Sequence, residues 1–287
     1  MTKQFLVFQS DFSNRDGAVS AMHGVSLSVC PTLSIHEITH NITPFHIWEA
    51  SYRLVQTVPF WPEGTVFVSV VDPGVGSNRR SVVAQTSTNH YIVTPDNGTL
   101  THVAQEIGLK KLFVIDEANN RLPTSAQLHT FHGRDIFAYT GARLAAGLIK
   151  PSDVGEEVAA YSTVHLAVAP PKVGETTIDG CIDIIDTPFG NIWTNIEAPT
   201  FGHLATHYNE HFSVTIAHEG NIVFKQSLPF IRSFAYSESD EPFLYVNSLR
   251  RLAIGLNQYS FADAYNVSFG PNWTVTIEKA KKVRAVL

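Results

Sequence analysis

The sequence predicts an α/β N-terminal domain, with a layered, mostly parallel sheet between helices, and an all-β antiparallel C-terminal domain. A chain of 287 residues is long for a single domain. Up to about residue 150, short β-branched runs alternate with segments of helical period, which is typical of a buried sheet covered by helices. Beyond the middle of the chain the hydrophobic period becomes two, as in antiparallel strands.

The N-terminal elements follow from this alternation. Strands are predicted where β-branched and aromatic residues cluster between turn residues, at 5–9, 32–38, 65–71, 81–85, 91–94 and 112–115. Helices are predicted where apolar residues recur at helical spacing, at 19–29, 47–55, 100–107 and 135–148, the last followed by Lys150-Pro151 as a stop signal. Together they predict a first domain over residues 1–166.

A pair of prolines marks the predicted domain boundary. Residues 167–174 (AVAPPKVG) read as a linker because consecutive prolines stiffen a connector. After it, alternating patterns predict strands at 177–185, 192–196, 212–218, 222–226, 243–246, 252–256 and 273–278. A small antiparallel barrel or sandwich is therefore expected over residues 175–287.

The composition excludes several classes of function. With 20 Lys and Arg against 26 Asp and Glu, the net charge is −6, so the chain has no basic field for nucleic acid or anionic membranes. Two cysteines, Cys30 and Cys181, stand in apolar contexts and are expected to be small buried hydrophobes in a reducing compartment. The sequence shows neither a signal peptide nor a membrane span, and we expect a cytoplasmic protein.

Residues 36–40 (HEITH) match the H-E-x-x-H pattern of zinc peptidases. That pattern needs a helix, which places both histidines on one face. Pro31 and Pro44 flank the segment, and it lacks a helical apolar stripe. In an extended segment His36 and His40 lie too far apart to chelate one ion. We therefore predict no metal site here and treat a zinc peptidase as the weakest alternative.

Three polar segments follow a predicted strand or precede a helix. Asp11 follows the first strand and residues 72–79 (DPGVGSNR) follow the third, so both are expected at the carboxyl edge of the sheet, where open α/β sheets bind ligands. His132 precedes the last helix of the domain, whose dipole disfavours an imidazolium. Taken singly, these residues are explained as well by a cap, a Pro-Gly turn and a packed histidine.

In combination and in order, these segments resemble the S-adenosylmethionine (SAM) hydroxide adenosyltransferases, which are SAM hydrolases related to fluorinase and chlorinase. The resemblance covers nearly the whole chain and rests on QSDFSNRD (9–16), TPF (43–45), FWPEGTV (60–66), DPGVGSNR (72–79), PDNG (95–98), FHGRD (131–135), DTPFGN (186–191) and NS (247–248). It implies hydrolysis of SAM to adenosine and L-methionine by attack of water or hydroxide at C5′. SAM is then the substrate, no cofactor or metal is expected, and the expected assembly is a homotrimer with sites between subunits.

The resemblance also implies roles for particular residues. Asp72, Arg79 and His132 would position and polarise the attacking water. The implied substrate-binding residues are Asp11 for the ribose hydroxyls, Asp16 for the methionine ammonium, Phe45 beside the sulfonium, Asp186, Phe189 and Asn191 for adenine, and Ser248 for the methionine carboxylate. Phe234 is a weaker candidate for a second wall of the adenine pocket, and core packing explains it better.

Three departures from the halide-using relatives favour hydroxide as the nucleophile. Those relatives typically have Tyr where Asp72 stands, and fluorinase has Ser where Gly133 stands. Their extra loop has no counterpart between Gly98 and Phe131. The alternatives are a SAM-dependent halogenase of the chlorinase type and a non-catalytic sensor of adenosyl ligands.

One departure affects the expected binding of the methionine carboxylate. Leu249 stands after Ser248, where fluorinase has Arg. The carboxylate therefore needs another donor, such as Arg250 or backbone amides.

Overall fold

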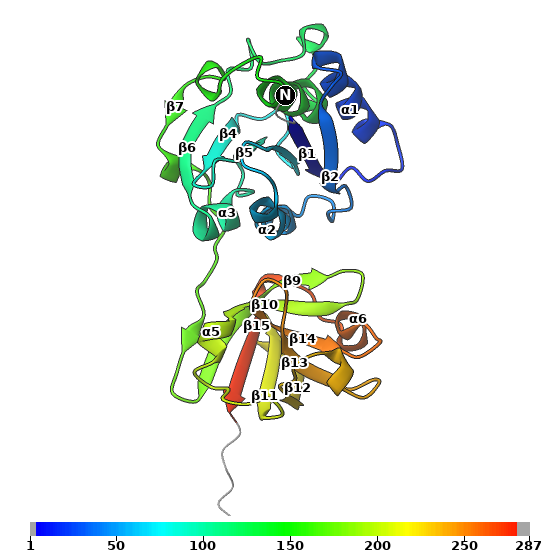
Figure 1. The fold of residues 1–287 in the computed structure, drawn as a ribbon, viewed down its shortest axis with the longest axis vertical. Helices are drawn as coiled ribbons and strands as arrows, with labels where there is room; N and C mark the ends of the chain where they lie inside the picture. Colours follow the sequence, from blue (N-terminus) through cyan, green and yellow to red (C-terminus); the bar gives the residue numbers. More distant parts are fainter. Residues whose placement is uncertain (1–3, 280–287) are drawn as a thin grey trace, which may run out of the picture. The chain divides into compact units, whose positions relative to one another are not determined.

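The chain folds into two compact units that divide after Leu166 (Figure 1). The computed structural model describes residues 4–279. The first unit is built on a seven-stranded sheet and the second on an eight-stranded sheet. Each unit has a hydrophobic core of its own. The architecture is thus an α/β unit followed by an antiparallel β unit.

The first unit contains the predicted strands and helices with small shifts at their ends. Its strands are β1 (Phe5–Ser10), β2 (Ser34–Thr39), β3 (Val66–Val70), β4 (Ser81–Thr86), β5 (Tyr91–Pro95), β6 (Leu109–Val114) and β7 (Glu157–Val158), in the order β2-β1-β3-β5-β4-β6-β7. Its longer helical segments are α1 (Ala18–Val29), α2 (Ile47–Thr57), α3 (Thr101–Glu106), η3 (Gly133–Ala138) and α4 (Tyr139–Ala145). The helix predicted at 135–148 differs most, because it begins as the π-helical segment η3 and ends earlier.

The first sheet is mixed. The prediction of a mostly parallel sheet is therefore wrong for half of its strand pairings. β2, β1, β3 and β5 run parallel to one another. β4 pairs antiparallel with β5 and β6, and β6 pairs antiparallel with β7. The four residues between β4 and β5 are too few for the crossover that parallel neighbours require, so these strands form a hairpin.

Helices cover both faces of the first sheet. α1, η3 and α4 share one core with the β1 and β3 residues Leu6 and Val68. On the opposite face, Gln9 of β1 donates a hydrogen bond from Nε2 to the carbonyl oxygen of Ala50 in α2. α4 approaches β3 so closely that a Cβ at Gly141 would lie 2.4 Å from Cγ2 of Val68. Within residues 4–279, the structure has no helix with the length and apolarity that a membrane span requires.

The second unit is an antiparallel sheet with two short helices. Its strands are β8 (Lys172–Val173), β9 (Thr177–Asp186), β10 (Asn191–Glu197), β11 (His211–His218), β12 (Asn221–Pro229), β13 (Pro242–Val246), β14 (Arg251–Leu256) and β15 (Gly270–Lys279), and its helices are α5 (Ala198–Phe201) and α6 (Phe261–Tyr265). The pairings between these strands are all antiparallel. Part of the predicted linker, Lys172–Val173, joins this sheet by pairing with β9.

The two cysteines differ in exposure. Cys181 on β9 is buried, and burial raises the pKa of its thiol, so this cysteine is the inert buried residue that the sequence predicts. Cys30 follows the last residue of α1 and is partly exposed. The prediction of burial is therefore correct for Cys181 and wrong for Cys30, whose place at a helix end keeps it near the surface.

The close approach of α4 to the sheet yields a stability prediction. Gly141→Ala is expected to lower the free energy of unfolding by about 1–3 kcal/mol, because the new methyl group overpacks against buried Val68. Gly24→Ala is the matched control, since Gly24 is an exposed residue of α1 with open space around it. That change is expected to raise the free energy of unfolding by about 0.5–1 kcal/mol. Urea titrations measure the free energy of unfolding of both variants. Equal changes in the two variants would contradict the close contact between Gly141 and Val68.

Candidate active site

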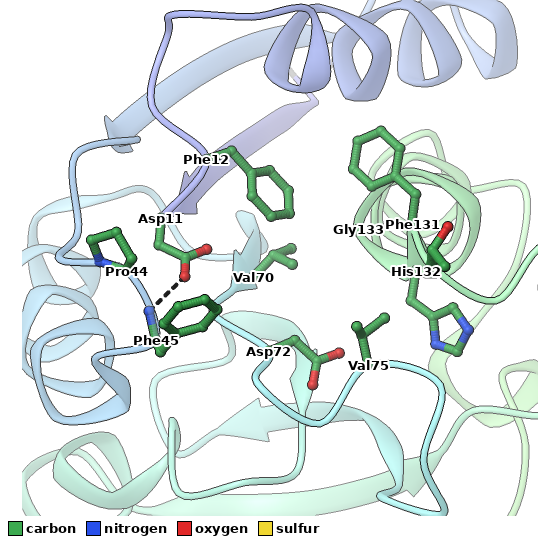
Figure 2. Close-up of a pocket in the computed structure, with 11 residues that line it drawn as sticks. Asp11, Phe12, Pro44, Phe45, Val70, Asp72, Val75, Phe131, His132 and Gly133 are labelled. Atoms are coloured by element: carbon green, nitrogen blue, oxygen red, sulfur yellow. Dashed lines mark hydrogen bonds between the residues drawn. The ribbon is translucent and has the colours of Figure 1, made fainter.

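A cavity of about 320 Å³ lies at the carboxyl edge of the parallel strands (Figure 2). Asp11 follows β1, Phe45 lies in the loop after β2, and Asp72 follows β3. These strands are parallel neighbours, so their carboxyl ends meet at one edge of the sheet. Phe131 and His132 reach the same cavity from the segment that precedes η3. The structure thus gathers four of the predicted site residues, Asp11, Phe45, Asp72 and His132, around one cavity.

Asp72 and Arg79 form a bidentate ion pair. Nε of Arg79 lies 3.0 Å from each carboxylate oxygen of Asp72, and Nη2 lies 2.6 Å from Oδ2. The side chain of Arg79 is only 10% exposed, and that of Asp72 is only 5% exposed. Phe137 lies beside the pair, with its ring centroid 5.2 Å from Cζ of Arg79. This geometry fixes the plane of the guanidinium and keeps it out of bulk water.

His132 is bound to the same guanidinium. Nη2 of Arg79 donates to Nδ1 of His132 over 3.0 Å, so this ring nitrogen is the acceptor. Burial is the largest cause that lowers the pKa of His132, and Arg79 and Arg121 lower it further. Glu117 and Asp72 oppose this shift, but the net pKa lies below the usual value. His132 is therefore a neutral side chain at neutral pH.

Three further residues close a ring around these groups. Ser81 Oγ accepts from Nη1 of Arg79 over 2.6 Å and donates to Oε1 of Glu117 over 2.8 Å. Oε2 of Glu117 accepts from Nη2 of Arg121 over 3.0 Å, and this nitrogen lies 3.5 Å from Nε2 of His132. Each charged side chain of the ring thus faces one of opposite sign. None of these three residues, Ser81, Glu117 and Arg121, was predicted from the sequence, in which their only signal is the four-residue spacing of the last two.

Arg79 differs from its partners in its access to the cavity. Of the residues that the structure describes, Asp72 and His132 line the cavity, whereas Arg79 is not among the lining side chains and contacts both of them. Its Nε, Nη1 and Nη2 all donate to protein groups. Arg79 therefore orients two groups that a ligand can reach.

Asp11 and Phe45 form a second contact on the cavity wall. Oδ2 of Asp11 accepts the backbone N–H of Phe45 over 2.8 Å (Figure 2). Phe45 has a φ of 68°, which is unusual for a bulky residue, and its side chain is left exposed at the cavity. Burial raises the pKa of Asp11, and the charge of Asp72 adds to this, while hydrogen bonds from backbone N–H groups oppose it.

Asp16 is not brought to this cavity. Its Oδ1 accepts the backbone N–H of Ala18 at the start of α1, and the residue is exposed. Among the described residues that line the cavity, Asp16 is absent. The local reason is that the Asp16 carboxylate forms an Asx-type turn with Ala18, while Gly17 is the N-cap of the helix.

A second cavity, of about 390 Å³, lies in the second unit. Its lining includes all four residues that the resemblance assigned to this unit, Asp186, Phe189, Asn191 and Ser248. It also includes Phe234, together with three residues that were assigned no role, Trp193, Tyr245 and Asn247. Phe234 packs against Phe243 and Tyr245 with ring centroids 5.0 Å away, so it is a packing residue and a cavity wall at once.

The turn between β9 and β10 presents Phe189 to this cavity. The N–H groups of Phe189 and Gly190 both donate to the carbonyl oxygen of Asp186, over 3.0 and 2.8 Å. Gly190 has a φ of 68°, and a Cβ there would lie 2.6 Å from the Cα of Ser260, so glycine is required. As a result the Phe189 ring is 67% exposed, an unusual state for phenylalanine.

Two amide groups at this cavity have unsatisfied atoms. Within residues 4–279, Oδ1 of Asn191 and Nδ2 of Asn247 are buried without a hydrogen-bond partner. Burial raises the pKa of Tyr245 to about 12, and the charge of Asp186 adds to the shift. A cavity lined by amide side chains and by the exposed Phe189 suits a flat ligand that carries polar groups at its edge.

The chain is similar to known proteins along most of its length. Residues 6–155 match the SAM hydroxide adenosyltransferase N-terminal domain, and residues 180–274 match the C-terminal domain of the same name. A fluorinase of Actinoplanes sp. (strain N902-109) is 30% identical over 299 residues, which cover 96% of this chain and 97% of the relative. An (R)-S-adenosyl-L-methionine hydrolase of Methanocaldococcus jannaschii is 32% identical over 268 residues, which cover 92% of each chain.

The fold is also similar to solved structures. The crystal structure of an uncharacterized conserved protein from Thermotoga maritima superimposes with a TM-score of 0.87 at 29% identity. The match covers 96% of this chain and 100% of that one. A conserved hypothetical protein from Thermus thermophilus gives a TM-score of 0.72 at 27% identity, over 96% of this chain and 99% of that one.

The charged side chains around His132 lead to a prediction about its pKa. Its pKa, followed by NMR of the imidazole, is expected below about 6.5. Arg121→Gln is expected to raise that pKa, because it removes a cation that disfavours the imidazolium, and Glu117→Gln is expected to lower it. A pKa that shifts in the same direction in both variants would contradict the arrangement.

Proposed function

The chain belongs to the SAM hydroxide adenosyltransferase family, and from this we propose that it hydrolyses SAM to adenosine and L-methionine. The observation that carries the proposal is the junction of Asp72, Arg79 and His132 at a cavity that Asp11 and Phe45 also line. Curated relatives named (R)-S-adenosyl-L-methionine hydrolase support the same reaction.

In the proposed reaction a water oxygen attacks C5′ of SAM. The new C5′–O bond forms as the C5′–S bond breaks, and the electron pair of the broken bond stays on sulfur. Methionine leaves as a neutral thioether, so the leaving group needs no acid. The difficulty lies with the nucleophile, because bulk water has a pKa of about 15.7. In-line placement of one water can lower the barrier by roughly 7–11 kcal/mol.

We assign the water to Asp72 and His132, because both side chains line the cavity. Asp72 receives the proton that the water loses as it bonds to C5′. Neutral His132, which lines the cavity, contacts the water and fixes its line of attack. Arg79 holds both groups in place, and its charge stabilises the hydroxide character that develops.

The substrate contacts follow from the chemistry of SAM. Asp11 has two carboxylate oxygens for the ribose hydroxyls, and the Phe45 ring can lie against the sulfonium. Asp16, which is exposed, is assigned to the methionine ammonium.

The second unit is assigned the two remaining parts of SAM. Phe189 and Asn191 take adenine, the ring by stacking and its polar edge by the amide. Ser248 takes the methionine carboxylate. Because the Leu249 N–H already donates to Oδ1 of Asn247, the exposed Arg250 is the better second donor. The homotrimer that the resemblance implies would combine the two kinds of cavity from neighbouring copies.

A SAM-dependent halogenase is the second candidate, because a fluorinase is also about 30% identical to this chain. Incubation of the purified protein with SAM in chloride buffer separates the candidates. Adenosine and methionine support hydrolysis, 5′-chloro-5′-deoxyadenosine supports halogenation, and SAM that binds without turnover supports a sensor.

Replacement of Arg79 tests its positioning role. Arg79→Lys keeps the charge but loses the bidentate contact, and we expect kcat to fall roughly 100-fold with little change in KM. Arg80→Lys is the matched control, because the neighbouring Arg80 pairs with Asp96 and not with Asp72. Circular dichroism shows whether both variants are folded. Equal kcat values for folded Arg79→Lys and wild type would refute the role.

Replacement of Phe189 tests the second cavity. Phe189→Ala is expected to raise KM for SAM about 2- to 10-fold, which is the effect of losing an aromatic contact of roughly 0.5–1.5 kcal/mol. Tyr236→Ala serves as the control, since Tyr236 is comparably exposed at 65% but lies outside the described lining of that cavity. Steady-state kinetics with SAM compare the two variants. An unchanged KM in Phe189→Ala speaks against adenine binding there.

A further inference from the structure

The H-E-x-x-H segment contributes to a cluster of ligand-type side chains at the edge of the first sheet. Residues 34–39 are the strand β2, so His36 and His40 do not converge, as the sequence predicts. His36 bonds Ser34 through Nε2 and packs against Trp61 with ring centroids 5.1 Å apart. His40 and Glu37 meet instead with His23, which comes from α1.

The three side chains converge on one point. Nε2 of His23 lies 2.6 Å from Oε1 of Glu37, and Nε2 of His40 contacts the other oxygen of the same carboxylate. One ligand atom of each residue lies within 4.8 Å of the others. The His40 side chain is 1% exposed, whereas His23 and Glu37 are 32% and 37% exposed. The cluster therefore has a rigid inner wall and an outer side that is open to solvent.

We propose that His23, Glu37 and His40 form a binding site for a divalent transition-metal ion of the zinc type. Two imidazoles and one carboxylate are a donor set that zinc uses when it keeps a fourth position for water. The open side of the cluster provides that position and an entry path for the ion. The site is separate from the cavity that is proposed to bind SAM, and no step of the proposed hydrolysis passes through it.

The position of the His23 ring also favours an ion. Within the described chain, Nε2 of His23 is buried and makes no well-directed hydrogen bond, in spite of its short distance to Glu37. A buried nitrogen in this state is available as a metal ligand.

A second contact fixes the orientation of the His40 ring. Nδ1 of His40 lies 2.7 Å from Oγ of the fully buried Ser10. Metal-bound histidines usually have their other ring nitrogen held in this way, which sets the tautomer and aims the free nitrogen at the ion. The Nε2 atom of His40 is thus directed at the cluster before any ion binds.

The exposed side chains must move apart for the ion to enter. Ligand atoms around a tetrahedral zinc stand roughly 3.3 Å from one another, as bond lengths near 2.0–2.1 Å require. The His23–Glu37 contact is shorter, at 2.6 Å. Because both side chains reach solvent, small rotations about their torsions provide the space without disturbing His40.

The location of the cluster gives an ion a structural effect. Ser10, which holds His40, precedes Asp11 in the chain, and the Ser13 N–H donates to the carbonyl oxygen of His40 over 2.7 Å. Metal bound at His40 would therefore stiffen the segment that carries Asp11 to the first cavity.

Zinc binding by the full chain tests the proposal. Metal-free protein is equilibrated with zinc ions, and affinity is measured by competition with a chromophoric chelator. Wild type is expected to bind stoichiometrically, one ion per chain, and cobalt ions are expected to give the visible absorption of a tetrahedral site. His23→Gln and Glu37→Gln are expected to weaken binding at least about tenfold. Zinc is expected to raise the Tm of wild type but not of these variants.

His36→Gln is the matched control. It lies in the same H-E-x-x-H segment and on the same strand but outside the cluster, so it is expected to bind zinc as wild type does. Loss of binding in His36→Gln with retention in His23→Gln would overturn the proposal, as would the absence of stoichiometric binding by wild type. Neither result depends on turnover of SAM. The experiment can therefore refute the metal site without refuting the proposed hydrolysis, and the reverse also holds.

Discussion

The buried ion pair between Asp72 and Arg79 is the contact on which the candidate site depends. Two charges that are mostly withdrawn from water are tolerated only when each satisfies the other. Removing one partner of such a pair costs about 3–5 kcal/mol, since the remaining charge is left buried. The pair also orients His132, because the guanidinium that binds Asp72 donates to its Nδ1. The geometry of the cavity wall therefore follows from one bidentate contact.

The strands of the first sheet determine where the candidate site residues lie, and the loops next to the strands carry those residues. Parallel pairing of β1, β2 and β3 brings Asp11, Phe45 and Asp72 to one edge, although the first and the last are far apart in the sequence. The π-helical segment η3 starts directly after His132, and such segments are frequent at functional sites. The second unit contributes aromatic rings and amides at a cavity of its own.

Hydrophobic periodicity was sufficient for the longer strands and for the helices of the first unit, but it predicted neither the short elements β7, β8, α5 and α6 nor the direction of the strands. A buried run such as 81–85 has the same composition whether its neighbour is parallel or antiparallel, and only the short connection to β5 reveals the hairpin. The same limit applies to Cys30, because an apolar neighbourhood in sequence does not show that a helix ends there.

The candidates that gather at the first cavity were those that a motif or a strand end marked in the sequence. Asp11, Asp72 and His132 carried such a signal, and the structure places all three at one cavity. Glu117 and Arg121 carried none beyond their spacing, because their function in the ring is to face other charges and any loop can present such a pair. His23 shows the limit most clearly, since one histidine on a helix becomes a candidate ligand only when the fold brings it to Glu37.

The proposed hydrolysis requires that a water oxygen attack C5′ of SAM. Turnover of SAM in heavy-oxygen water, followed by mass spectrometry of both products, measures where that oxygen goes. The label is expected in the 5′-hydroxyl of adenosine, whereas methionine is expected to stay unlabelled. Unlabelled adenosine, or cleavage that leaves the sulfur on the sugar, would contradict the proposed hydrolysis.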